Sequence, residues 1–103
     1  MNLVSSIHDS ENLLSNALDI TKKMVQNSAP VSISLTRQML WRSLESSGPY
    51  DAHVIESKAI DSRGASEDAK EGVSSFLEKR PAEFKNKVSS DMPEFFPWWK
   101  DTN

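Results

Sequence analysis

The stretch that decides the fold is Ser66-Glu67-Asp68-Ala69-Lys70-Glu71-Gly72-Val73-Ser74-Ser75-Phe76-Leu77-Glu78-Lys79-Arg80-Pro81. It predicts an amphipathic helix, because apolar residues recur through it at helical spacing. Ser66 is placed to cap the N-terminus, and the acidic residues behind it fall where the helix dipole favours anions. Lys79 and Arg80 suit the last turn, and Pro81 predicts that the helix stops there. We therefore expect a helix over residues 66–80.

Further helices are predicted upstream of this stretch. Residues 11–26 carry a wide apolar stripe, formed by Leu13, Leu14, Ala17, Leu18, Ile20, Thr21, Met24 and Val25. Such a width implies burial on more than one side. Ser46–Pro49 is the clearest turn in the chain. The helix that follows this turn runs from Tyr50 to about Arg63, with an apolar side at Tyr50, Val54, Ile55, Ala59 and Ile60.

The segment after Pro30 has two interpretations. Val31, Ile33 and Leu35 alternate with serines, which is typical of a strand. The apolar residues from Leu35 to Leu44 fall at helical spacing, and Pro30 suits the first turn of a helix. The residues alone leave strand and helix equally supported at the start of this segment.

Composition limits the chain to one domain with a modest core. It has 103 residues, of which 37% are hydrophobic, and a chain this short buries a smaller fraction of its surface than a full-sized enzyme. The formal net charge of -3 argues against a general nucleic-acid binder. Cysteine is absent, which excludes disulfides and cysteine-ligated zinc. No apolar run approaches a membrane span, and the first residues lack the pattern of a signal peptide, so the cytoplasm is the expected location.

The run over 66–84 closely resembles the C-terminal signature of the crotonase superfamily, the enoyl-CoA hydratases and isomerases. The matching residues are Asp68, Glu71, Gly72, Phe76, Leu77, Lys79, Arg80 and Phe84. Upstream, Ser28–Arg37 resembles the family segment S-P-x-A-x-x-x-T-K, with Arg37 in place of lysine. Leu3-Val4 and Ile7 resemble the strand before the family's C-terminal helices, with Asn2 where glycine is usual. Because the segment at 28–37 is helical in relatives, the resemblance favours a helix over Val31–Leu44.

The expected fold is therefore all-α, with about four helices and room for one short N-terminal strand. Residues 1–9 are expected to be a residual strand and lead-in, residues 10–80 a C-terminal helical oligomerisation module, and residues 81–103 an irregular, aromatic-rich tail. The resemblance implies that the chain corresponds to the last third of a longer enzyme. It would then be a truncated or broken-down product, or a separately encoded remnant that starts at Met1.

The resemblance also implies a function. Crotonase enzymes act on acyl-CoA thioesters, and an oxyanion hole must hold the charge that develops at the thioester carbonyl. The residues that do this lie in the N-terminal part of relatives, and none maps onto this sequence. The chain alone is therefore predicted to be inactive, with no catalytic residue. The alternative is a stand-alone, non-catalytic helical interaction domain.

Partners follow from the same resemblance. The C-terminal helices of relatives build a trimer interface, so we expect self-association, as a trimer, a dimer or another oligomer. Phe84 and Lys87 match the spacing of a phenylalanine and a lysine that contact the adenine and ribose phosphate of CoA. A flat ring stacks on a base, and an ammonium binds phosphate as a point charge. The alternative is that Phe84 plugs the core and Lys87 is a solvated surface charge. No cofactor is expected on the chain alone.

Three other features have competing interpretations. His8 and His53 lack neighbours at metal-ligand spacing, so surface histidines are favoured over a metal site. Asp68 and Glu71 could mimic an acid/base pair, but their place at a helix N-terminus explains them without catalysis. Gly72, inside a helix, suggests that its own backbone closely approaches a neighbouring element; the alternative is a merely suboptimal helix position.

The aromatic tail predicts an interface. It concentrates four large rings in a segment bounded by prolines, at Phe95, Phe96, Trp98 and Trp99. Large rings left in water form an apolar patch, which usually marks a contact surface. Docking on the same chain or on another subunit is favoured over docking on a membrane, because the segment lacks a cluster of flanking basic residues.

Overall fold

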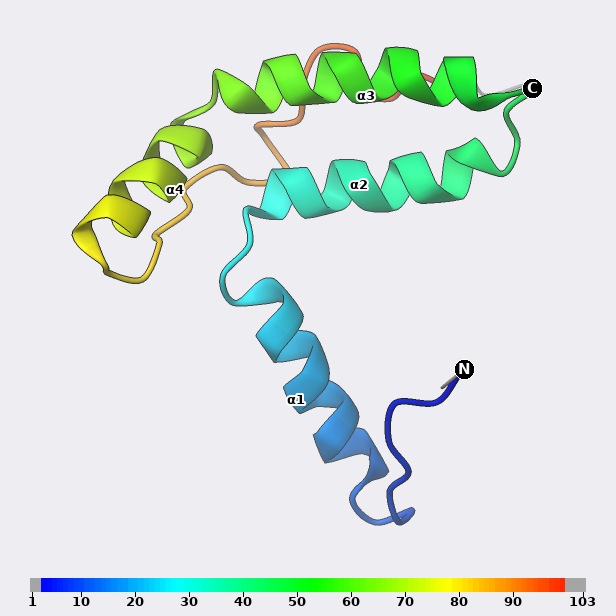
Figure 1. Ribbon diagram of the computed structural model, residues 1–103, viewed down its shortest axis with the longest axis vertical. Coiled ribbons are helices and arrows are strands. Elements are labelled where there is room, and N and C mark those ends of the chain that lie inside the picture. Colours follow the sequence, from blue (N-terminus) through cyan, green and yellow to red (C-terminus); the bar gives the residue numbers. More distant parts are fainter. Residues whose placement is uncertain (1–2, 100–103) are drawn as a thin grey trace.

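The computed structural model describes residues 3–99, and within them it forms four α-helices (Figure 1). They are α1 (Leu13–Val25), α2 (Pro30–Ser43), α3 (Pro49–Gly64) and α4 (Glu67–Glu78). No strand occurs in this part of the chain, so the all-α prediction is confirmed. The ambiguous segment after Pro30 is helical from its first residue, because a proline at the first helical position loses no hydrogen bond there.

The short N-terminal strand does not form. Residues 3–9 are irregular, and Leu3, Val4 and Ile7 are exposed. A strand needs a neighbouring strand to satisfy its backbone groups, and residues 3–99 supply none. Met1 and Asn2, the latter at the position where the family usually has glycine, lie outside the described residues.

Helix α4 ends two residues earlier than the sequence predicts. Lys79 has left-handed backbone angles, with φ 54° and ψ 41°. The N–H of Lys79 donates to the Phe76 carbonyl and that of Arg80 to the Ser75 carbonyl, which closes the helix end. Pro81 disfavours a helical residue before it. Lys79 and Arg80 therefore lie beyond the last turn, contrary to expectation, and the chain reverses direction at this point.

Helices α2 and α3 lie antiparallel and side by side, and α4 continues from the end of α3 (Figure 1). The buried apolar residues are Val31, Leu35 and Ala59. Partly buried side chains pack against them, namely Met39, Met92, Phe95, Phe96 and Trp98. The aromatic tail thus docks on its own chain, across the α2–α3 pair, as one of the two favoured interpretations expects.

Helix α1 leans away from the other three helices (Figure 1), and none of its residues is buried. The radius of gyration is 16.9 Å, whereas a compact domain of this length has about 13 Å. The core is correspondingly small for 103 residues. Many large apolar side chains of the described residues therefore remain in water.

The faces of α4 are reversed relative to a simple amphipathic helix. Its buried residues are Asp68 and Ser75. Its apolar stripe is exposed and consists of Val73, Phe76 and Leu77, with Phe76 at 81% exposure. The inward face is thus polar, and its carboxylates meet the chain that folds back after Lys79.

Candidate functional site

Two neighbouring carboxylates on α4 organise the segment that follows the helix. Ser66 caps α4, because its hydroxyl accepts a hydrogen bond from the N–H of Ala69 at 3.2 Å. The cap starts the helix at Glu67, which sets Asp68 and Glu71 one turn apart on one face. Both carboxylates point toward residues 80–86, as their hydrogen bonds show.

Asp68 is 4% exposed and binds backbone amides of the returning segment. Its Oδ1 accepts hydrogen bonds from the N–H groups of Lys85 at 2.8 Å and Asn86 at 3.1 Å. Its Oδ2 is buried without a hydrogen-bond partner among the described residues. A buried carboxylate is stabilised by such amide donors. Asp68 therefore serves as an acceptor for the backbone.

Glu71 binds one side chain and one backbone amide. The Arg80 guanidinium donates two hydrogen bonds to the Glu71 carboxylate, from Nη1 to Oε1 at 2.6 Å and from Nη2 to Oε2 at 2.9 Å. The N–H of Glu83 donates to Oε1 at 2.8 Å. These hydrogen bonds, that from Arg80 first, lower the pKa of Glu71 from 4.5 to about 2. A carboxylate held ionised in this way is poorly suited to exchange protons near neutral pH.

The non-catalytic interpretation of Asp68 and Glu71 thus agrees with the geometry, but for a different reason. Their place at the helix N-terminus predicts stabilisation by the helix dipole, whereas their partners in the structure are the amides of residues 83, 85 and 86 and the Arg80 guanidinium. Sequence reasoning missed these contacts because backbone donors carry no residue signature. The only available signal is the proline after Arg80, which indicates that the chain turns there.

Phe84 and Lys87 lie in the same returning segment. Phe84 is half-buried, and its ring covers Gly72 of α4. Lys87 is exposed, and its N–H donates to Oδ2 of Asp91 at 2.6 Å. Phe84 is thus partly accessible to solvent, and Lys87 is more so. These exposures are compatible with a ligand contact. They are equally compatible with Phe84 as a core residue and Lys87 as a solvated surface charge.

Gly72 lies against the returning segment, as expected of a glycine whose backbone approaches a neighbouring element, but not so closely that a side chain is excluded. A Cβ placed there would lie 3.8 Å from Cε1 of Phe84, an ordinary van der Waals distance. The glycine therefore sits under a side chain that leaves room for a methyl group.

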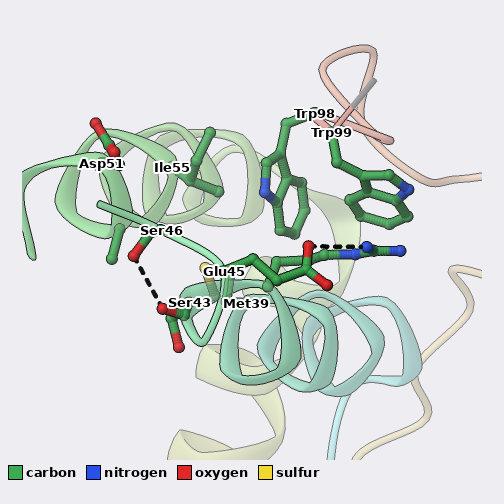
Figure 2. A pocket seen from close by; sticks show the side chains of 10 residues that line it. Met39, Ser43, Glu45, Ser46, Asp51, Ile55, Trp98 and Trp99 are labelled. Carbon is green, nitrogen blue, oxygen red and sulfur yellow. Dashed lines mark hydrogen bonds and ion pairs between the residues drawn. The ribbon is translucent and has the colours of Figure 1, made fainter. Parts of the chain in front are cut away.

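A separate cavity of about 230 Å³ lies between the facing sides of α2, α3 and the tail. Figure 2 shows Trp98 and Trp99 projecting from the tail over it, with Met39 on α2 and Ile55 on α3. The Arg42 guanidinium lies 4.2 Å from the centre of the Trp99 ring and binds Glu45 at 3.2 Å. The cavity is smaller than common ligand pockets of about 300–1,000 Å³. Sequence reasoning missed it, because its walls come from distant parts of the chain.

The histidines have local partners. His8 shares a hydrogen bond of 2.7 Å with the hydroxyl of Ser6, and Nδ1 of His53 lies 3.8 Å from Oε2 of Glu56. Among residues 3–99, no three His, Cys, Asp or Glu side chains gather in a metal-binding arrangement. In the same residues, no helix is both long and apolar enough to cross a membrane.

Comparison with known proteins identifies relatives of the chain. Two enoyl-CoA hydratases of Alternaria alternata, one of them ACTT3, are each 35% identical over 89 residues, which is 86% of this chain and 29% of theirs. The short-chain-enoyl-CoA hydratase of Clostridium acetobutylicum is 34% identical over 86 residues, 82% of this chain and 32% of that protein. The chain thus spans about a third of the length of these relatives. No protein-family model matches it.

Proposed function

Since this chain belongs to the crotonase superfamily, whose C-terminal helical part it resembles, we propose that it is the C-terminal portion of an enoyl-CoA hydratase/isomerase-like enzyme. The observation that carries the proposal is the identity of 34–35% to enoyl-CoA hydratases over most of this chain. The parent enzyme would act on acyl-CoA thioesters by hydration or a double-bond shift. We place it in the cytoplasm and in fatty-acid metabolism.

The first role proposed for the segment is subunit association. Helix α1 exposes an apolar stripe at Leu14, Leu18 and Val25, and Leu14 is 71% exposed. Helix α4 exposes its own stripe at Phe76 and Leu77. Exposed apolar stripes of this kind are typical of contact surfaces. Burial of these stripes between subunits would complete the small core of the isolated chain.

The second proposed role is a contribution to CoA binding by Phe84 and Lys87. Phe84, which is partly accessible, would offer its ring as a stacking surface for adenine, and the exposed Lys87 would offer a charge for phosphate. Both residues belong to the segment that α4 holds in place. Neither supplies a proton or a nucleophile, so the role is binding and orientation.

A calorimetric titration of the purified chain with CoA tests the binding role. The sequence predicts no cofactor on the chain alone, but the half-buried Phe84 and the exposed Lys87 lead us to expect saturable CoA binding to the chain. Phe84→Ala and Lys87→Ala should each lose about tenfold or more in affinity. Lys58→Ala, which removes an exposed lysine from α3, is the matched control and should bind as the original chain does. The absence of any CoA binding would contradict this role.

Catalysis is assigned to the part of the parent enzyme that this chain does not match. The purified chain should therefore show no hydration of a short enoyl-CoA above background, measured by the loss of enoyl absorbance. Clear turnover by the chain alone would overturn this assignment.

The second candidate function is a stand-alone helical interaction domain without catalysis. It is favoured by the same exposed apolar stripes, which suit any helical partner. The titration separates the two candidates. Association without CoA binding favours the interaction domain, and CoA binding that depends on Phe84 and Lys87 favours the enzyme portion.

A further inference from the structure

The returning segment is fixed to α4 through its backbone. Residues 83–86 place three N–H groups on two carboxylates, with Glu83 on Glu71 and the other two on Asp68. We call this arrangement the carboxylate clasp, and it comprises Asp68, Glu71 and the amides of residues 83, 85 and 86. Hydrogen bonds from amides to a charged acceptor are stronger than bonds between neutral groups.

The clasp is itself braced. Arg80 follows the left-handed Lys79 and returns to Glu71 with a bidentate pair, so the carboxylate cannot rotate freely. Asp68 is buried, and its hydrogen bonds are therefore screened little by water. The two carboxylates thus hold the backbone on both sides of Phe84.

The register of the clasp determines where the proposed ligand contacts lie. Phe84 stands between the bound amides of Glu83 and Lys85, and its ring is directed onto Gly72, one residue after Glu71. Lys87 follows the last bound amide by one residue, and its own N–H is held by Asp91. Because these hydrogen bonds fix the backbone next to Phe84 and Lys87, they also fix the positions of the Cα atoms from which the two side chains extend.

We propose that Asp68 and Glu71 are positioning residues, which hold Phe84 and Lys87 in place for the adenine and phosphate end of CoA. This inference rests on the CoA contact proposed above and adds the two carboxylates to it. Neither carboxylate touches the ligand, and each acts through the backbone of residues 83–86. Preorganisation of this kind raises affinity by lowering the cost of ordering the contact groups.

Amide hydrogen exchange of the full chain, measured by NMR, tests the clasp directly. In Asp68→Ala, the amides of Lys85 and Asn86 should exchange about tenfold faster or more, because their charged acceptor is gone. In Glu71→Ala, the amide of Glu83 should do the same, because its acceptor is also gone. The amide of Asp91, which binds the Lys87 carbonyl, serves as an internal reference and should change little.

Two further variants separate the clasp from a general loss of fold. Asp68→Asn keeps an acceptor oxygen and should restore part of the slow exchange. Glu67→Gln removes a charge from the same helix turn, where Glu67 pairs with Lys70 on the surface, and should leave all three amides unchanged. Unchanged exchange at Lys85 and Asn86 in Asp68→Ala would overturn the clasp, whatever CoA does.

The ligand arm uses CoA and 4′-phosphopantetheine as probes in calorimetry. The Asp68 and Glu71 variants should lower the affinity of the chain for CoA about tenfold. They should change its affinity for 4′-phosphopantetheine less than about twofold, because only CoA carries the adenine and ribose phosphate. Equal loss of both probes, or unchanged CoA affinity despite fast amide exchange, would overturn the positioning role. If the original chain binds no CoA while its clasp amides exchange slowly, the proposed CoA contact is wrong and the clasp has a structural role only.

Discussion

At the scale of single residues, the polar face of α4 explains why the signature carries carboxylates at Asp68 and Glu71. Each lies one helical turn from the other and accepts backbone N–H groups from the returning chain. A neutral apolar residue at either place would leave amides of that segment without their partners, which is costly when they are buried. The signature therefore specifies a loop as well as a helix.

The ion pair of Glu71 predicts a pH dependence. Its pKa lies at about 2 in the folded chain, against an ordinary value of 4.5, chiefly because of the hydrogen bonds from Arg80. A depressed pKa adds stability above about pH 4.5, and this contribution is lost as the pH falls from 4.5 towards 2. Urea unfolding at several pH values should show Glu71→Gln less stable than the original chain at pH 6, with the gap closing in acid.

The matched control for this prediction is Glu11→Gln, which changes an exposed glutamate ahead of α1. Glu11→Gln should leave the decrease in unfolding free energy between pH 4.5 and pH 2 unchanged. A gap between Glu71→Gln and the original chain that stays constant from pH 6 to pH 2 would show that the ionisation of Glu71 does not support the fold.

Gly72 makes a second residue-scale prediction. Because a Cβ would lie 3.8 Å from the Phe84 ring, alanine fits without displacing it. Gly72→Ala should stabilise the chain by about 0.5–1 kcal/mol, since glycine costs that much inside a helix. A rise in the urea midpoint checks this, and a fall would mean that the backbone and ring approach more closely than the structure shows.

At the scale of elements, the sequence predicts much of the helix content and little of the packing. Pro30, the turn at Ser46–Pro49 and the cap at Ser66 mark helix starts through local chemistry, which a sequence displays directly. Periodicity alone could not decide the start of α2, because Val31, Ile33 and Leu35 also alternate. The family resemblance was needed to favour a helix there.

Packing is harder to predict, because it depends on partners far away in the chain. The apolar stripe of α4 suggests an inward face, yet the structure turns Asp68 and Ser75 inward and leaves Phe76 outside. The candidate site shows the same limit. Phe84 and Lys87 are predicted from the resemblance alone, whereas the clasp depends on backbone donors that no residue type reveals.

The docked tail makes an element-scale prediction. Trp98 packs against the small core on α2 and α3, whereas Trp41 on α2 is 60% exposed. Trp98→Ala should destabilise the chain by about 2 kcal/mol, roughly half the cost of emptying a fully buried aromatic site. Trp41→Ala is the matched control and should cost less than about 0.5 kcal/mol in the isolated chain. Equal effects in urea unfolding would mean that the tail does not dock as described.

At the scale of the whole molecule, the chain is more extended than a compact domain of its length. Its radius of gyration of 16.9 Å exceeds that of a compact domain, and α1 buries none of its side chains. An exposed stripe on α1 and another on α4 are available for a second copy of the chain. Self-association would bury them and enlarge the core, which gives the proposed oligomer a physical cause.

The measurement that tests this account most directly is the molar mass of the chain in solution, by light scattering over a range of concentrations. A monomer has 11.6 kDa, and we expect a mass at least twice that value, reduced towards the monomer in Leu14→Glu with Leu18→Glu. Lys22→Glu, which changes a charge of α1 instead of its apolar stripe, should leave the mass unchanged. A stable, fully folded monomer of the original chain at every concentration would contradict the account.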